Sequence, residues 1–108
     1  MTKIISARIK FLPPEAGGRL EPARDGVTPQ LKLGEIFTST VIRSRAGTTV
    51  FDPGATYDVD LEIKFWDQYG SLFDPEAPAE FYEGSRLIAV GEFRSSDPER
   101  GTSTDTDE

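Results

Sequence analysis

Residues 52–65 constrain the fold more than any other part of the sequence, because a Pro-Gly turn is followed there by strict alternation. Apolar side chains occupy every second position: Tyr57, Val59, Leu61, Ile63 and Phe65. Charged side chains lie between them: Asp58, Asp60, Glu62 and Lys64. Successive side chains of a β-strand point to opposite faces, so this run predicts a long central strand with an apolar core face and a charged outer face.

Several other segments have the composition of strands. Residues 3–12 alternate and end at Pro13-Pro14, which cannot donate to a ladder. Shorter strands are expected at residues 29–33, 35–43, 81–82 and 86–94, with Gly91 marking a bulge or a close backbone contact. Residues 15–26 are expected to form a loop, and residues 67–78 a long connection across one end of the fold.

No segment has a sustained helical period, and glycine and proline turns separate the strands at near-regular intervals. The pattern predicts an all-β fold, a single antiparallel Greek-key β-barrel of about six strands, over residues 1–94. Residues 95–108 contain no aliphatic side chain, five acids and one base, and are expected to form a disordered acidic tail.

The composition argues against several classes of chemistry. The chain of 108 residues has no Cys and no His, so disulfides, thiolate nucleophiles, the usual catalytic triads and most zinc sites are excluded. No phosphate-binding loop of the Gly-x-x-x-x-Gly-Lys-Ser/Thr type occurs, so we expect no nucleotide, no metal and no other cofactor. No signal sequence or membrane-length apolar run is found, which favours a cytoplasmic protein that does not contact the membrane.

Charge favours protein partners over nucleic acid. Residues 1–94 hold 14 acids against 11 bases, which disfavours broad affinity for DNA or RNA. Asp58, Asp60 and Glu62 could together hold a hard cation, but a solvated outer face is the simpler interpretation. Arg43 and Arg45 are interpreted as solvated charges, and the acidic face of the central strand is expected to repel RNA.

The loops carry a resemblance to a known family. A Glu-Ala-Gly-Gly-Arg loop at residues 15–19 is followed by Gly-Val-Thr-Pro-Gln at 26–30, Pro53-Gly54, and Glu-Gly-Ser-Arg at 83–86 before a last strand containing Gly91. In order and spacing these motifs resemble the C-terminal barrel domain of elongation factor Tu, over about residues 7–93. The GTPase domain of that family is absent, so the chain looks like a stand-alone third domain.

The resemblance implies two kinds of partner. In the family this domain contacts the T stem of aminoacyl-tRNA, and its other faces dock neighbouring domains and the nucleotide-exchange factor. The tRNA-contacting turns correspond to Gly18 and Arg19, and to Gly84 and Arg86. Glycine N–H groups and a guanidinium fork suit phosphate, although a structural turn in which Arg19 pairs with a carboxylate is the simpler alternative. The sequence departs from the family at Leu20, which replaces a His, and at Ser85, which replaces a Gly.

Aromatic side chains form a second candidate site. Trp66, Tyr69 and Tyr82 could form an exposed recognition patch, because aromatic residues are enriched at interaction hot spots; the alternative is a plug at the end of the barrel. The leading hypothesis is therefore a non-catalytic module that docks a protein. Binding to a tRNA-type backbone is the alternative, and an enzyme that uses paired carboxylates is disfavoured.

Overall fold

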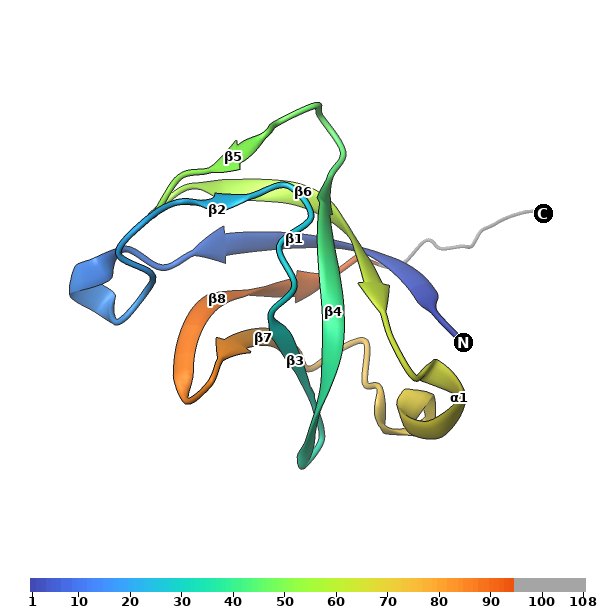
Figure 1. Ribbon diagram of the computed structural model, residues 1–108. Coiled ribbons are helices and arrows are strands. Elements are labelled where there is room, and N and C mark those ends of the chain that lie inside the picture. The colour runs from blue at the N-terminus through green and yellow to red at the C-terminus, as the bar shows by residue number, and fades with distance from the viewer. Residues whose placement is uncertain (95–108) are drawn as a thin grey trace.

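The computed structural model describes residues 1–94, and the tail expected at residues 95–108 lies outside this range. Six strands close into an antiparallel barrel in the order β1-β6-β4-β3-β7-β8 (Figure 1). Their bounds are β1 Lys3–Phe11, β3 Gln30–Leu33, β4 Ile36–Ser44, β6 Thr56–Ile63, β7 Pro78–Glu83 and β8 Arg86–Phe93. Strands β3, β4 and β6 are consecutive neighbours and β1 lies beside β6, so the predicted Greek-key barrel is confirmed.

The central position predicted for β6 is correct. It pairs with β1 from Lys10↔Thr56 to Lys3↔Ile63, and on its other side with β4 from Ser44↔Val59 to Thr40↔Ile63. Val59, Leu61 and Ile63 are fully buried, as the alternation indicates.

Phe65 departs from this pattern: it has the parity of the apolar face but lies beyond the end of the strand. Strand β6 ends at Ile63, and Phe65 has φ +58° with a side chain that is 52% exposed. The left-handed backbone at Phe65 turns the chain into α1, Trp66–Tyr69. Sequence alternation continues past the point at which the ladder ends, so parity alone could not place this side chain.

One end of the barrel is closed by a short two-stranded ribbon, and one of its strands lies in the segment expected to be a loop. The loop contains the single 3₁₀ turn η1, Pro14–Ala16, and β2, Ala23–Arg24, which pairs with β5, Val50–Phe51 (Figure 1). Under this ribbon the fully buried Phe51 ring stacks on Phe11 at 4.9 Å and meets Tyr57 edge-on at 5.0 Å. These stacked and edge-on contacts are favourable geometries for aromatic rings, so the cluster anchors the ribbon.

The other end is closed by the connection from β6 to β7. This connection is partly helical, with α1 followed by the 3₁₀ turn η2, Gly70–Leu72. The Trp66 ring lies 5.5 Å from the ring of Phe73, which lies 4.7 Å from that of Phe93. A Cβ at Gly70 would come within 2.6 Å of the Trp66 indole, so glycine is required there for the indole to pack.

The seam between β1 and β8 closes the barrel. Ile88 has no partner in β7, because Tyr82 pairs with Leu87 and Phe81 with Ala89, so the register shifts at this point. This bulge lets the consecutive Ile88 and Ala89 side chains both be fully buried. Gly91 provides the close backbone contact: a Cβ there would overlap the Arg8 carbonyl and come within 2.7 Å of Ile9 Cα.

Replacing Gly91 with alanine should therefore open the seam. We expect Gly91→Ala to lower the free energy of unfolding by about 3 kcal/mol, because the methyl group meets backbone that can move only by separating β1 from β8. Urea denaturation followed by Trp66 fluorescence measures this loss. Gly47→Ala is the matched control: its φ of +77° costs about 1 kcal/mol, but no atom lies within 4 Å of the new methyl group. Equal losses in the two variants would contradict the seam argument.

Candidate functional site

The two glycine-arginine turns predicted from the sequence lie together at the β2–β5 end of the barrel. Arg19 forms an ion pair with Glu83, with Nε 3.2 Å from Oε1, and Arg86 Nη1 donates to the Gly18 carbonyl at 3.1 Å. Each arginine thus contacts the turn that carries the other. Gly18 is buried against the Leu12 backbone, where a Cβ would overlap the carbonyl of Leu12.

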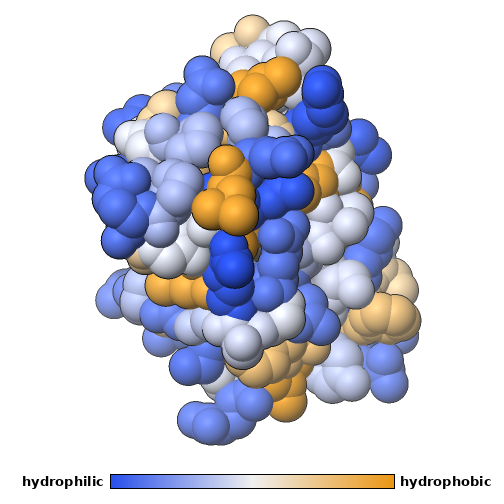
Figure 2. All heavy atoms as spheres, turned by 60° about the vertical axis from the view of Figure 1, so that its left-hand side comes forward, coloured by the Kyte–Doolittle hydropathy of each residue, from blue (hydrophilic) through white to orange (hydrophobic). Residues whose placement is uncertain are grey.

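These contacts define the chemistry of the turns. Arg19 pairs with the Glu83 carboxylate, as the structural alternative for this turn expects. This pairing neutralises part of the positive charge that would attract a phosphate. Arg19 and Arg86 still line a shallow hollow of about 320 Å³ with Leu20, Glu21 and Glu83. Figure 2, which brings this side of the molecule forward, shows a largely hydrophilic surface with separate small hydrophobic areas.

The outer face of β6 is not the acidic surface that the sequence suggested. Three arginines from the neighbouring chain segments pair with its three acids, and we call this set the charge ladder. Its nitrogen–oxygen distances are Arg8–Asp58 2.9 Å, Arg43–Glu62 3.1 Å and Arg45–Asp60 3.5 Å. Arg43 and Arg45 thus pair with carboxylates of β6, while their side chains stay about half exposed to solvent, at 51% and 54%.

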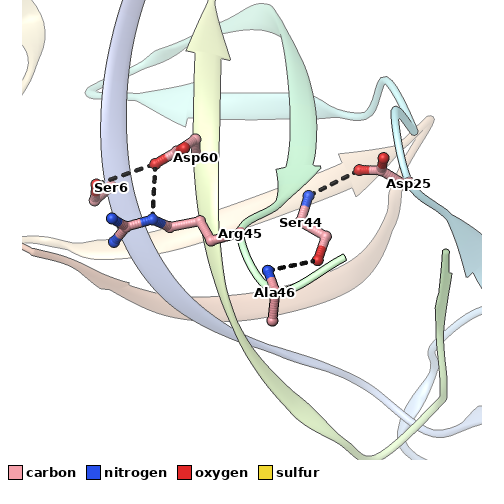
Figure 3. Close-up of polar contacts among 6 residues, drawn as sticks. All are labelled: Ser6, Asp25, Ser44, Arg45, Ala46 and Asp60. Carbon is pink, nitrogen blue, oxygen red and sulfur yellow. Dashed lines mark hydrogen bonds and ion pairs between the residues drawn. The ribbon is translucent and has the colours of Figure 1, made fainter. Parts of the chain in front are cut away.

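Further polar contacts hold the ladder in place. Asp60 also accepts a hydrogen bond from Ser6 Oγ at 3.1 Å, so β1 and Arg45 converge on one carboxylate (Figure 3). The chain just before Arg45 is fixed by the Ser44 N–H, which donates to Asp25 at 2.7 Å (Figure 3). Both contacts are made to Oδ1 of Asp60.

Within the charge ladder, the hydrogen bond between Arg8 and Asp58 shifts the pKa of both side chains. The hydrogen bond from Arg8 lowers the pKa of Asp58, and the same bond raises the pKa of Arg8. The carboxylate form is thus favoured in the folded protein.

The predicted aromatic site divides into two parts. Trp66 turns inward and belongs to the end plug with Phe73 and Phe93. Tyr82 lies on the outside, where its ring meets that of Phe37 edge-on at 5.3 Å and its hydroxyl donates to Glu80 at 3.1 Å. This hydrogen bond raises the pKa of Tyr82.

Tyr69 lines a groove together with Phe37 and Phe65, two aromatic residues whose exposure the sequence did not indicate. We call it the aromatic groove; it has a volume of about 210 Å³. Its lining is Gln30, Phe37, Thr38, Ser39, Phe65, Gln68 and Tyr69. Phe37 is 47% exposed and links the groove to Tyr82. Phe37 lies opposite in parity to Thr38 and Thr40, whose burial is seen only in the folded barrel, so the apolar character of Phe37 gave no sign of its exposure.

Residues 1–94 contain no group of three or more acidic, His or Cys side chains arranged to hold a metal ion. Over the same range, no helix has the length and hydropathy needed to cross a bilayer.

Loss of the Asp58 carboxylate should reduce the sensitivity of the protein to acid. Because the folded pKa of Asp58 lies below the unfolded value, its contribution to stability is present above about pH 4 and is lost as the pH falls through the folded pKa. Asp58→Asn should therefore flatten the decline in stability below about pH 4, measured by urea denaturation at several pH values. Arg8→Met removes the partner and should flatten the decline in the same way. An unchanged acid dependence in both variants would contradict this assignment.

Comparison with known protein families finds none that matches this chain, and comparison with curated proteins finds no significant match.

Proposed function

We propose that this chain is a non-catalytic binding module, a stand-alone cytoplasmic barrel of the elongation factor Tu C-terminal type, that docks a protein partner. The observation that carries the proposal is the aromatic groove, where Phe37 and Phe65 expose about half of their side chains. Large aromatic side chains that contribute little to the core are the groups that most often anchor protein interfaces.

The distribution of polar partners supports a binding role over a catalytic one. Asp58, Asp60 and Glu62, the acids that share a strand face, each pair with an arginine. General acid–base catalysis needs a carboxyl that can exchange its proton, and the hydrogen bond from Arg8 lowers the pKa of Asp58, which favours its ionised form. With no His or Cys in the chain, the residues that could perform catalysis are few.

A pull-down from native lysate, with and without ribonuclease, tests the proposal. The full chain should retain a protein partner after ribonuclease treatment, and the partner should rebind when purified. The double variant Arg19→Ala/Arg86→Ala is the matched control and should retain the same partner, because the two arginines lie outside the groove. Loss of all captured material on ribonuclease treatment would contradict docking to a protein.

A second candidate, binding to a tRNA-type backbone, is favoured by the arginines around the glycine turns. Arg19 lines two hollows, one shared with Arg86 and one of about 340 Å³ shared with Arg24. Three guanidinium groups at one end of the barrel could contact successive phosphates.

A salt titration of tRNA binding tests this candidate. Binding through these arginines should weaken steeply as salt rises, and Arg19→Ala should reduce both the affinity and the salt slope, the latter by about one. Lys32→Ala, on β3, removes one positive charge elsewhere and serves as the control. No measurable binding at low salt would exclude the RNA candidate.

A further inference from the structure

We infer that the aromatic groove binds an extended peptide segment of the partner that places one large apolar side chain beside lysine or arginine. The inference rests on the proposed docking function and names the site and the chemistry of what it takes. Four features of residues 1–94 support it: the size of the groove, the backbone of Phe65, the polar lining and the surrounding charge.

The size of the groove suits one side chain. Its volume of about 210 Å³ is below the roughly 300–1,000 Å³ typical of sites for small organic ligands. Phe37 and Phe65 leave apolar surface uncovered, so burial of an aliphatic or aromatic anchor between them would remove that surface from water. A peptide anchor is therefore a better fit than a free metabolite.

Phe65 holds its ring at the groove despite an unfavourable backbone. It is the one residue other than glycine with positive φ within residues 1–94, and the left-handed region favours Gly, Asn and Asp. Because the Phe65 ring is half exposed, folding alone gives little reason for a bulky side chain there. Strained conformations of this kind are found preferentially at ligand-binding sites.

The polar lining can bind a peptide backbone. The side chains of Gln30, Ser39 and Gln68 make no hydrogen bond to any other group of residues 1–94, so their donors and acceptors remain available. The two glutamine amides and the serine hydroxyl can each donate to a C=O group and accept from an N–H group of an extended segment.

The surrounding charge selects a basic segment. Residues 65–85 contain five acids and no Lys or Arg. Of these acids, Asp74, Glu76 and Glu80 have no ion-pair partner within residues 1–94, whereas every acid of the charge ladder is paired. Lys32, the register partner of Phe37, and Lys64, which precedes Phe65, supply two positive charges against these three unpaired acids and balance only part of the charge. The excess negative potential attracts lysine and arginine and repels phosphate.

Selection from a random 12-residue peptide display library against the immobilised full chain tests the inference. Enriched peptides should combine a Leu, Ile, Phe or Trp with at least two Lys or Arg. Synthetic versions should bind the chain in a titration followed by fluorescence anisotropy, and the affinity should fall when the bases are replaced by glutamate. Enrichment of acidic peptides, or of peptides without an apolar anchor, would overturn the inference.

Two groove variants separate a binding defect from a folding defect. Phe65→Asn places a residue that tolerates positive φ, so its thermal midpoint should stay within about 4 °C of the parent, while peptide affinity falls at least about tenfold. Phe37→Thr keeps a strand-forming residue in β4 and should lose affinity to a similar extent. The control Arg45→Ala, on the charge ladder, should bind as the parent does.

The triple variant Asp74→Asn/Glu76→Gln/Glu80→Gln tests the charge argument. It should weaken binding of the basic peptides about fivefold at low salt, and the difference from the parent should shrink as salt rises.

The outcomes also separate this inference from the proposed function. If enriched peptides bind Phe65→Asn and Phe37→Thr as tightly as the parent, the groove assignment is wrong although docking of protein segments stands. If no peptide is enriched and the lysate partner is lost on ribonuclease treatment, both fail.

Discussion

Close contact between β1 and β8 is the constraint on which the rest of this structure depends. Gly91 lies opposite Ile9 on one side and Ala79 on the other, so the residue without a side chain stands where two strands converge. The pairs Ala7↔Phe93 and Ala89↔Phe81 likewise set a small residue against a large one. This alternation of sizes lets the side chains of a narrow six-stranded barrel fit together in its interior.

Closure of the barrel leaves two open ends, and aromatic clusters fill both. At one end Phe11, Phe51 and Tyr57 support the β2–β5 ribbon and the glycine-arginine turns. At the other end Trp66 packs on Phe73, and Tyr69 of α1 packs partly against the core and also lines the aromatic groove. The side chains that could bind a partner are therefore carried by short segments whose positions are fixed by the packing beneath them.

Patterns within single segments could be predicted from the sequence, and contacts between segments could not. The alternation of β1 and β6 depends on local periodicity, and a glycine within a strand pattern indicated a bulge or close contact at residue 91, although its partners Arg8 and Ile9 come from another strand. The pairing of Arg8 with Asp58 joins residues that are 50 positions apart, and that of Arg43 with Glu62 joins residues 19 apart, so only the register of the barrel reveals them. The same lack of register information hid the exposure of Phe37 and the end of β6 before Phe65.

The ion pairs also determine which parts of the surface carry uncompensated negative charge. Net charge is a property of the whole chain, but the potential at a surface depends on the charges that lack a close partner. Three arginines neutralise the outer face of β6, so the strand that looked most acidic contributes little excess charge. The segment around α1 and β7 has acids and no bases between Lys64 and Arg86, and it borders the most exposed aromatic side chains of the barrel. Apolar surface and uncompensated negative charge thus coincide at one place, and a partner that offers a basic, apolar segment satisfies both.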